Sequence, residues 1–438
     1  MTAGRRRAAP AGGGRRDGRA ALARGARPGV AALLGLALGA GATLALQRPP
    51  DRPTAAPAAP DGTPAAATSA AGAASLPTRP AAAPADRVLL AWTPGRLPAG
   101  LGRRLRRAPA VRAVTVVKGG RLDLAGSTDA DGRAVDRPPR GMTVPLEAIA
   151  FDPSTYAGFL PASARAAFRR LAPTEALLGA TSARLRRLGP GGRLHVASGG
   201  RVRPGGRWLT VAGVVDDALV GAAEVAVSGG GGRAVGLTRD RYALLAYRGR
   251  RAAVAEAVRR ALPAGLPVRL RGPGETPFFR AGDAVLPQAM VKERFGEFAW
   301  RPAGGGDFVQ DPAWRATGLA TGQVPLLGRV RCNRALLPAL AGAMRELQQR
   351  NLAGLVDPAG FAGCWNSRLT RSGGGVSRHA WGAAVDLNVA GNPTGLASAQ
   401  DRRLVEVMER WGFTWGGRWL VPDPAHFEYL RPPDSAAG

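Results

Sequence analysis

Apolar and polar positions alternate over short distances between about residues 87 and 290, as they do in a mixed α/β region. The order strand, helix, strand is predicted twice, over residues 88–117 and again over residues 242–272. Between these two units, the sequence TEALLGATSARLRRL (174–188) favours a helix, and residues 193–220 favour strands. The individual predictions at the two ends are strands at 88–92, 111–117, 242–248 and 266–272 and helices at 101–108 and 251–262.

The pattern changes to longer helical repeats over residues 291–431, after a stretch (292–300) that leads into a loop. Leucine and methionine recur at helical spacing in 334–350, which predicts a helix. A second helix is predicted to start at Ser398, because Asp401 follows three residues later as in a capping box. FTW, RWLV and HFEYL then predict antiparallel strands around a Gly-Gly turn.

The N-terminus carries the signals of an exported protein. Residues 1–28 hold eight arginines and a single acid, and residues 29–46 are 18 consecutive residues without charge. A run of this length can span a bilayer, although it lies at the short end of the range for transmembrane helices. The arginines place residues 1–28 in the cytoplasm. The triplet Ala40-Gly41-Ala42 also fits a signal-peptidase site, so a cleaved signal is the alternative. We expect an uncleaved anchor, a single-pass protein of the cell membrane, and extracytoplasmic domains beyond it.

The remaining organisation follows from composition. Residues 47–86 hold 9 prolines and 15 alanines and no aromatic residue, which predicts an extended linker. Residues 87–290 then form an extracytoplasmic α/β domain with no visible catalytic constellation, residues 291–431 a second domain, and residues 432–438 a tail. His195 lies in an alternating strand pattern and is interpreted as structural.

The formal charge of +30 at first suggests a nucleic-acid-binding protein. However, Lys118 and Lys292 are the only lysines, and the arginine excess is spread over the whole chain. No basic run is interleaved with aromatic residues, as a groove for single strands requires. We therefore expect a solvated arginine-rich surface and no nucleic-acid partner.

The two cysteines, Cys332 and Cys364, predict a disulfide. Thirty-one residues lie between them, so they lack the close spacing of structural zinc sites built on thiolates. An exported domain is exposed to oxidising conditions, in which a disulfide persists.

Two histidines and one aspartate form the candidate chemical centre. His379 precedes Asp386 by seven residues, and His426 follows 40 residues later on a different predicted element. Two imidazoles and a carboxylate are a ligand set for tetrahedral Zn²⁺ that leaves the fourth position to water. Such a metal ion lowers the pKa of that water and polarises a scissile carbonyl.

A general base must reach the water. Asp423, three residues before His426, is the preferred candidate because the D-P-A-H stretch brings its carboxylate back beside the ligand. Glu428 is the alternative. On a strand it shares a face with His426, so it also suits the role of the acceptor that orients the imidazole.

These residues resemble the M15 family of zinc D,D-peptidases, which includes D-alanyl-D-alanine carboxypeptidases of the vancomycin-resistance type. The family pattern S-x-H-x-x-G-x-A-x-D, followed by acid-x-x-H, is matched without a gap by Ser377, His379, Gly382, Ala384, Asp386, Asp423 and His426. The resemblance implies that His379, Asp386 and His426 bind zinc and that Asp423 is the catalytic acid and base, where many relatives have Glu. It covers residues 291–431 and implies an α+β fold of the Hedgehog/D,D-peptidase type, with a small antiparallel sheet holding the metal.

The stretch GCWNSRLTRS (363–372) matches the place where relatives keep a substrate-binding arginine. Arg368 is the first choice and Arg371 the alternative. Ser377 fits either a hydrogen bond to substrate or the capping of a turn.

Together these observations predict a zinc-dependent peptidase acting on the stem peptides of peptidoglycan, with D-alanyl-D-alanine carboxypeptidase as the first expectation. An L-alanyl-D-glutamate endopeptidase on the same scaffold is one alternative. The other is a non-catalytic scaffold, in which the zinc domain docks on cell-wall peptide and residues 87–290 bind a protein partner.

Overall fold

The computed structural model of this chain describes residues 87–198, 206–284, 286–370 and 374–430. The predicted cytoplasmic tail (1–28), anchor (29–46), linker (47–86) and C-terminal tail (432–438) lie outside these ranges. Among the described residues, no helix has the length and apolar character needed to cross a membrane.

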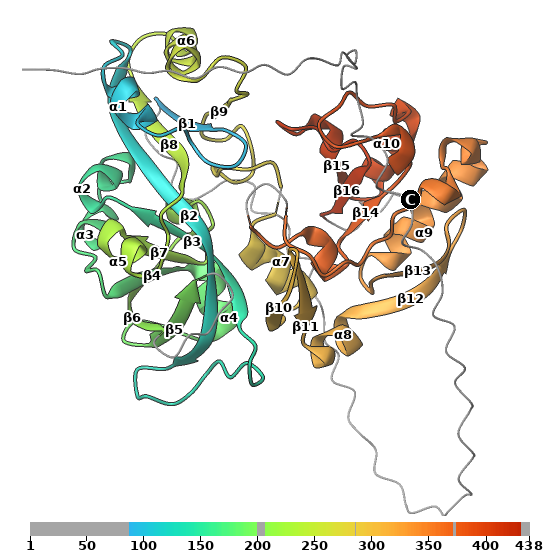
Figure 1. Ribbon diagram of the computed structural model, residues 1–438, viewed down its shortest axis with the longest axis horizontal. Coiled ribbons are helices and arrows are strands. Elements are labelled where there is room, and N and C mark those ends of the chain that lie inside the picture. Colours follow the sequence, from blue (N-terminus) through green and yellow to red (C-terminus); the bar gives the residue numbers. More distant parts are fainter. Residues whose placement is uncertain (1–86, 199–205, 285, 371–373, 431–438) are drawn as a thin grey trace, which may run out of the picture. The chain divides into compact units, whose positions relative to one another are not determined.

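Residues 87–284, here called the sheet region, form one nine-stranded sheet. Its order is β3-β7-β4-β6-β5-β2-β8-β1-β9, with parallel pairing only at β3–β7 and β4–β6. The long strand β2 pairs with β8 through its first half and with β3 and β5 through its second half (Figure 1). The strands are β1 (Val88–Trp92), β2 (Val111–Thr128), β3 (Val144–Phe151), β4 (Glu175–Gly179), β5 (Arg193–Ser198), β6 (Arg207–Val215), β7 (Val225–Ser228), β8 (Asp240–Tyr247) and β9 (Arg269–Arg271).

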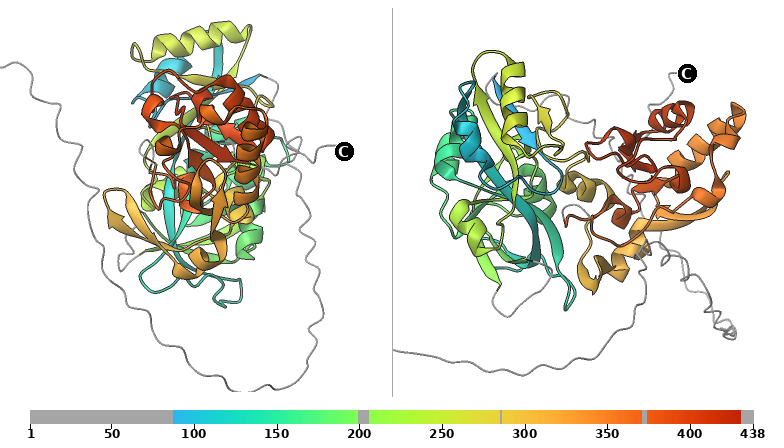
Figure 2. Two further views of the ribbon diagram at one scale, coloured as in Figure 1. Left: turned by 90° about the vertical axis from the view of Figure 1, so that its right-hand side faces the viewer. Right: turned by 45° about the horizontal axis from the view of Figure 1, so that its top comes forward.

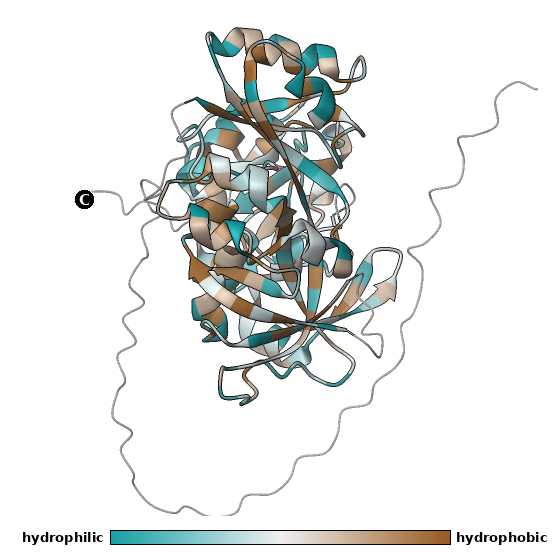
Figure 3. Ribbon diagram, turned by 90° about the vertical axis from the view of Figure 1, so that its left-hand side faces the viewer, coloured by the Kyte–Doolittle hydropathy of each residue, from teal (hydrophilic) through white to brown (hydrophobic). Residues whose placement is uncertain are grey.

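Both faces of the sheet are covered at β1 and β7, which explains the continuous apolar runs of these strands, whereas β6 exposes alternate residues. Along β1, Leu89 packs into a core with α1 and α6, whereas Leu90 packs on the opposite face with Phe168 of α3. Helices α1 and α6 lie together at one end of the sheet (Figure 2), and apolar residues are concentrated on its strands (Figure 3). The helices are α1 (Leu101–Arg106), α2 (Pro153–Tyr156), α3 (Arg165–Arg169), α4 (Ala180–Arg186), α5 (Gly229–Ala234) and α6 (Arg251–Ala261).

The elements predicted at the two ends of the sheet region are confirmed. They come together in space, because β1 pairs with β8 and β9 and β8 pairs with β2, all antiparallel. The helix predicted over 174–188 is wrong in its first third. Residues Glu175–Gly179 form strand β4, and the helix α4 begins only at Ala180. The run Ala176 to Leu178 is buried between neighbouring strands, and this tertiary burial outweighs the local helical pattern.

Residues 286–430, here called the C-terminal region, contain two hairpins and one three-stranded antiparallel sheet of order β14-β16-β15. The small antiparallel sheet predicted for this region is therefore confirmed. The helices are α7 (Gln288–Phe295), α8 (Pro312–Gly318), α9 (Leu337–Gln349) and α10 (Arg402–Arg410). The strands are β10 (Trp300–Gly304), β11 (Asp307–Gln310), β12 (Leu319–Val324), β13 (Gly328–Asn333), β14 (Ala384–Asp386), β15 (Phe413–Trp415) and β16 (His426–Tyr429).

Three local predictions in this region need correction. Residues 292–300 do not simply lead into a loop, because they include the end of α7 and the start of β10. Helix α10 is capped by Asp401, whose side chain accepts from the backbone N–H of Arg403, and not by Ser398. RWLV (418–421) is not a strand, because the Gly-Gly turn before it forms a 3₁₀ turn over Gly416–Arg418 that takes the chain out of the sheet.

The predicted disulfide is confirmed. Cys332 at the end of β13 is bonded to Cys364, with 5.0 Å between their Cα atoms. Both half-cystines are buried in the hydrophobic core of the C-terminal region. The bond ties a hairpin to the segment that precedes the candidate metal ligands.

A cluster of buried charged side chains joins α7 to the sheet region. Lys292 contacts Glu224 at 2.7 Å and Glu297 at 2.8 Å. Arg186 on α4 contacts the same carboxylates at 3.4 Å and 2.5 Å. Because opposite charges are paired, their burial leaves no uncompensated charge inside the protein. The cluster therefore fixes the start of the C-terminal region on the sheet.

Candidate metal centre

The three predicted metal ligands come from three neighbouring elements. Asp386 on β14 pairs directly with His426 on β16, so their side chains lie on the same face of the small sheet. His379 lies in a 3₁₀ turn (Arg378–Trp381) that Ser377 caps by accepting from the backbone N–H of His379. Gly382 ends this turn at φ 62°, a left-handed conformation that favours glycine. The tight reversal brings His379 back over the start of β14.

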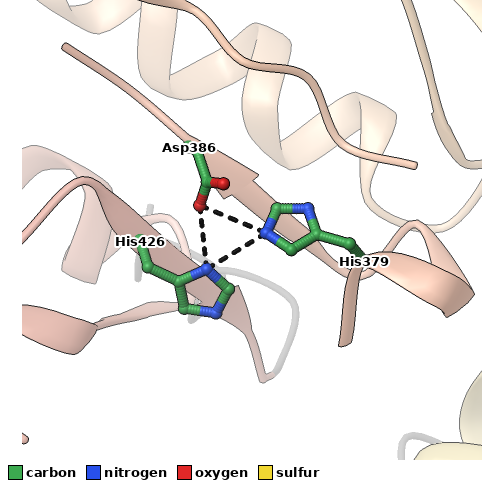
Figure 4. Close-up of side chains that lie close together, drawn as sticks. All are labelled: His379, Asp386 and His426. Atoms are coloured by element: carbon green, nitrogen blue, oxygen red, sulfur yellow. Dashed lines mark hydrogen bonds and ion pairs between the residues drawn. The ribbon is translucent and has the colours of Figure 1, made fainter. Parts of the chain in front are cut away.

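The donor atoms of these side chains meet at short distances (Figure 4). His379 Nε2 lies 3.1 Å from Asp386 Oδ1 and 3.1 Å from His426 Nδ1, and His426 Nδ1 lies 2.9 Å from Asp386 Oδ1. In a tetrahedral zinc site with bonds of about 2.0–2.1 Å, neighbouring ligand atoms lie about 3.3 Å apart. Among the described residues, these three form the one group of histidine, cysteine and acidic side chains that fits a metal ion. The donor set and its spacing fit zinc.

The other nitrogen of each imidazole faces an acceptor. His379 Nδ1 lies 2.8 Å from the carbonyl oxygen of Cys364, which can only accept a hydrogen bond. His426 Nε2 lies 3.5 Å from a carboxylate oxygen of the buried Glu428. These acceptors favour a proton on Nδ1 of His379 and on Nε2 of His426, so the facing nitrogens keep their lone pairs for a metal. Glu428 thus lies where the sequence predicted an acceptor.

The electrostatics of the group favour a positive charge at its centre. Burial alone would raise the pKa of Asp386, but hydrogen bonds from His379 and His426 hold that pKa well below its usual range. Burial alone would lower the pKa of His426, but Asp386 and Glu428 raise it to about 10. Asp386 and Glu428 therefore stabilise positive charge at His426, and a divalent ion held by His379, Asp386 and His426 would supply such charge in place of a proton.

Asp423 lies in the turn before β16, outside the group of three. Its backbone N–H donates to the carbonyl oxygen of Gly416, and its own carbonyl oxygen accepts from the N–H of His426. Its half-buried carboxylate accepts from the hydroxyl of Thr394 at 3.0 Å. The D-P-A-H stretch is thus a closed turn beside a ligand, and the carboxylate is not one of the three donors.

The predicted substrate-binding residues Arg368 and Ser377 lie next to the 3₁₀ turn that carries His379. The backbone N–H of Ser377 donates to the carbonyl oxygen of Arg368 at 3.1 Å, which places the two residues next to each other. Arg368 is half-buried, and it forms an isolated β-bridge with Asp307. Arg371, the alternative arginine, lies outside the described residues. His195 is elsewhere, on β5, with its ring stacked on Trp208 at 4.8 Å.

Two contributions to the site are missing from the sequence analysis. Gln310 is buried and donates to the carbonyl oxygen of Ala380 at 2.7 Å, while its own oxygen accepts from Trp365 and Ser367. It thereby holds together the two segments that carry His379 and Cys364. The second contribution is the carbonyl oxygen of Cys364. A single glutamine and a backbone oxygen carry no pattern in the sequence, so only tertiary structure identifies them.

Comparison with known families decides the type of domain. Residues 370–429 match the family model described as D-alanyl-D-alanine carboxypeptidase, of peptidase family M15. This segment of the C-terminal region is similar to M15 peptidases. The matched segment contains His379, Asp386 and His426 together with Asp423, and it lies within residues 291–431, where the resemblance was expected. No curated protein matches the chain.

Proposed function

We propose that this chain is a zinc-dependent peptidase that hydrolyses the stem peptides of peptidoglycan, and first of all a D-alanyl-D-alanine carboxypeptidase. One observation carries the proposal: inside the M15 segment, two imidazole nitrogens and a carboxylate oxygen lie within 3.1 Å of one another. Three protein ligands and an open fourth position are typical of catalytic rather than structural zinc.

Each residue of the site has a separate role in the proposed hydrolysis. Zinc held by His379, Asp386 and His426 would polarise the scissile carbonyl and make a water molecule nucleophilic near neutral pH. Asp423 accepts the proton of the attacking water and returns it to the leaving amine. Arg368 contributes positive charge toward the substrate and the developing oxyanion. Glu428 keeps the ring of His426 in the orientation that presents Nδ1 to the metal.

The purified full-length protein, loaded with zinc and incubated with muropeptides, tests this assignment, with the released fragment identified by mass. Free D-alanine supports the carboxypeptidase, and a cut between L-alanine and D-glutamate supports the endopeptidase. No product from zinc-loaded protein would contradict both and leave the non-catalytic, peptide-binding scaffold. A parallel sample stripped of metal with a chelator is the control, because it retains the chain without the ion.

We also propose that residues 29–46 anchor the protein in the cell membrane, with the peptidase domain outside the cytoplasm. The disulfide between Cys332 and Cys364 supports an oxidising location, and peptidoglycan is reached from that side. N-terminal sequencing of the mature protein tests the anchor. A mature chain that begins near Thr43 would instead mean a cleaved signal peptide.

A further inference from the structure

Trp419 lies beside one of the candidate metal ligands. Its ring centroid is 5.1 Å from that of His426, the two rings are tilted by 54°, and the tryptophan is only half-buried. A peptide bound at the metal centre would therefore lie close to this ring. Trp419 follows directly on the 3₁₀ turn over Gly416–Arg418, and its backbone N–H donates to the carbonyl oxygen of Gly416 at 3.0 Å. It belongs to no strand, so strand pairing within the small sheet does not fix its position.

The sheet region holds the main chain on both sides of Trp419. On one side, the guanidinium group of Arg269 donates to the carbonyl oxygen of Arg418 at 3.1 Å. On the other side, the carboxylate of Asp283 accepts from the backbone N–H of Leu420 at 2.8 Å. Arg269 and Asp283 both lie outside residues 370–429, the segment that matches the M15 family model.

The side chain of Leu420 adds an apolar contact to the same region. It packs against a core cluster of the sheet region that includes Tyr156 and Tyr242. Polar and apolar contacts therefore both fix the segment that carries Trp419.

Asp283 is itself held firmly. The carboxylate oxygen that does not contact Leu420 lies 2.6 Å from Arg269 and 3.2 Å from Arg271, which are the first and last residues of β9. Arg271 also donates to the carbonyl oxygens of Arg280 and Gly282, which lie just before Asp283 in the same loop. A 9% exposed carboxylate with both oxygens paired has little freedom to move. The chain of contacts thus runs from β9 through Asp283 and Leu420 to Trp419.

We propose that the sheet region positions a wall of the substrate site, and that Asp283 is the positioning residue through which it does so. This inference rests on the proposed function. The three metal ligands and their acceptors, Cys364 and Glu428, all lie in the C-terminal region. Loss of Asp283 should therefore weaken the binding of substrate peptide and leave the affinity for zinc unchanged.

The test compares Asp283→Ala with Asp240→Ala in the full-length protein. Asp240 is a matched control, because it pairs with Lys118 on the neighbouring strand of the same sheet. Hydrogen exchange at residues 416–422 is the direct readout, and we expect exchange in Asp283→Ala to be about tenfold faster or more. Binding of a synthetic stem peptide ending in D-alanyl-D-alanine, measured by calorimetry, should weaken about tenfold. Zinc affinity should stay within about twofold, and Asp240→Ala should match the wild type in all three.

The outcomes separate this inference from the proposed function, because neither exchange nor peptide binding requires hydrolysis. Unchanged exchange in Asp283→Ala, or faster exchange with unchanged peptide binding, would overturn the inference. A parallel loss of zinc affinity would do the same, because it would indicate general loosening of the domain. If Asp283→Ala does not fold, Arg269→Ala removes the bond to Arg418 and one of the two cations that contact Asp283, while Asp283 keeps its bond to Leu420 and its contact with Arg271. This variant should shift exchange and binding in the same direction. Wild-type protein that binds the peptide without cutting it would contradict the peptidase and leave the positioning role standing.

Discussion

At the scale of single residues, each histidine of the candidate metal centre is oriented by a group that the metal would not touch. The carbonyl oxygen of Cys364 faces Nδ1 of His379, and Glu428 faces Nε2 of His426. Each imidazole therefore offers a metal the nitrogen that already points at Asp386. Because these contacts orient the rings, they would reduce the cost of ordering the histidines when a metal binds.

Substitution of Asp423 should abolish peptide hydrolysis without abolishing zinc binding. Asp423→Ala is expected to keep about one zinc ion per chain and to lose peptidase activity by roughly 10²-fold or more, the scale of a missing general base. Asp423→Glu should retain a measurable fraction, because relatives use Glu at this position. His379→Ala should instead lose zinc, since it removes one of three protein ligands. Measuring the zinc content and the hydrolysis rate of each variant tests these expectations. Normal cleavage by Asp423→Ala would transfer the role of base to Glu428.

The acceptor of His426 should matter for affinity. Glu428→Gln keeps the shape of the side chain and removes its charge, so the negative environment that favours a cation at His426 is weakened. We expect zinc affinity to fall about 10- to 100-fold, as for other groups that orient metal ligands. Competition with a chromophoric chelator measures this, with His195→Ala on the distant strand β5 as the control. An affinity equal to that of the wild type would mean that Glu428 has only a packing role.

At the scale of elements, the sequence predicts those segments whose own pattern decides their structure. Strand β1 is predicted because its apolar run fits a covered sheet, and α9 because its leucines recur at helical spacing. Strand β4 is missed because burial between strands, not local pattern, selects its conformation. In the site, the ligand triad is found because its residue types and spacing are distinctive. Gln310 and Asp283 are not found, since their roles depend on partners distant in the sequence.

The disulfide should support both stability and the metal site. Replacing Cys332 and Cys364 with serine opens a loop of 32 residues, and the chain-entropy model then predicts a loss of about 3–4 kcal/mol in the free energy of unfolding. Denaturant titration of the double variant beside the wild type measures this loss. Zinc affinity should fall as well, because the carbonyl oxygen that orients His379 belongs to Cys364. Two free thiols in non-reduced protein exported from cells would contradict the structural role of the bond.

At the scale of the whole described molecule, two groups of charged contacts are among the polar contacts that join the sheet region to the C-terminal region. The first is the buried cluster of Glu224, Lys292, Arg186 and Glu297 at α7. The second is the contact of Asp283 with Leu420 beside the metal centre. Because both include charged side chains, we expect the stability of the described protein to depend on pH.

Glu297 should account for a measurable part of that dependence. Burial alone would raise its pKa, but Arg186 and Lys292 lower the pKa to about 2. The ordinary value is 4.5, so between these limits the unfolded chain binds a proton that the folded chain does not. The stabilisation by Glu297 is therefore complete above about pH 4.5 and declines as the pH falls toward 2, by at most about 1.4 kcal/mol per pH unit.

Denaturant unfolding of wild type and Glu297→Gln between pH 7 and pH 2 isolates this contribution from that of the other carboxylates. The variant leaves Arg186 and Lys292 with one carboxylate fewer, so it should be less stable than the wild type at neutral pH. The difference in unfolding free energy should stay constant down to about pH 4.5 and then shrink, because acid removes from the wild type the charge that the variant already lacks. A difference that stays constant down to pH 2 would mean that Glu297 titrates alike in the folded and unfolded chains. Its contacts with the two cations would then not stabilise the junction between the sheet region and the C-terminal region.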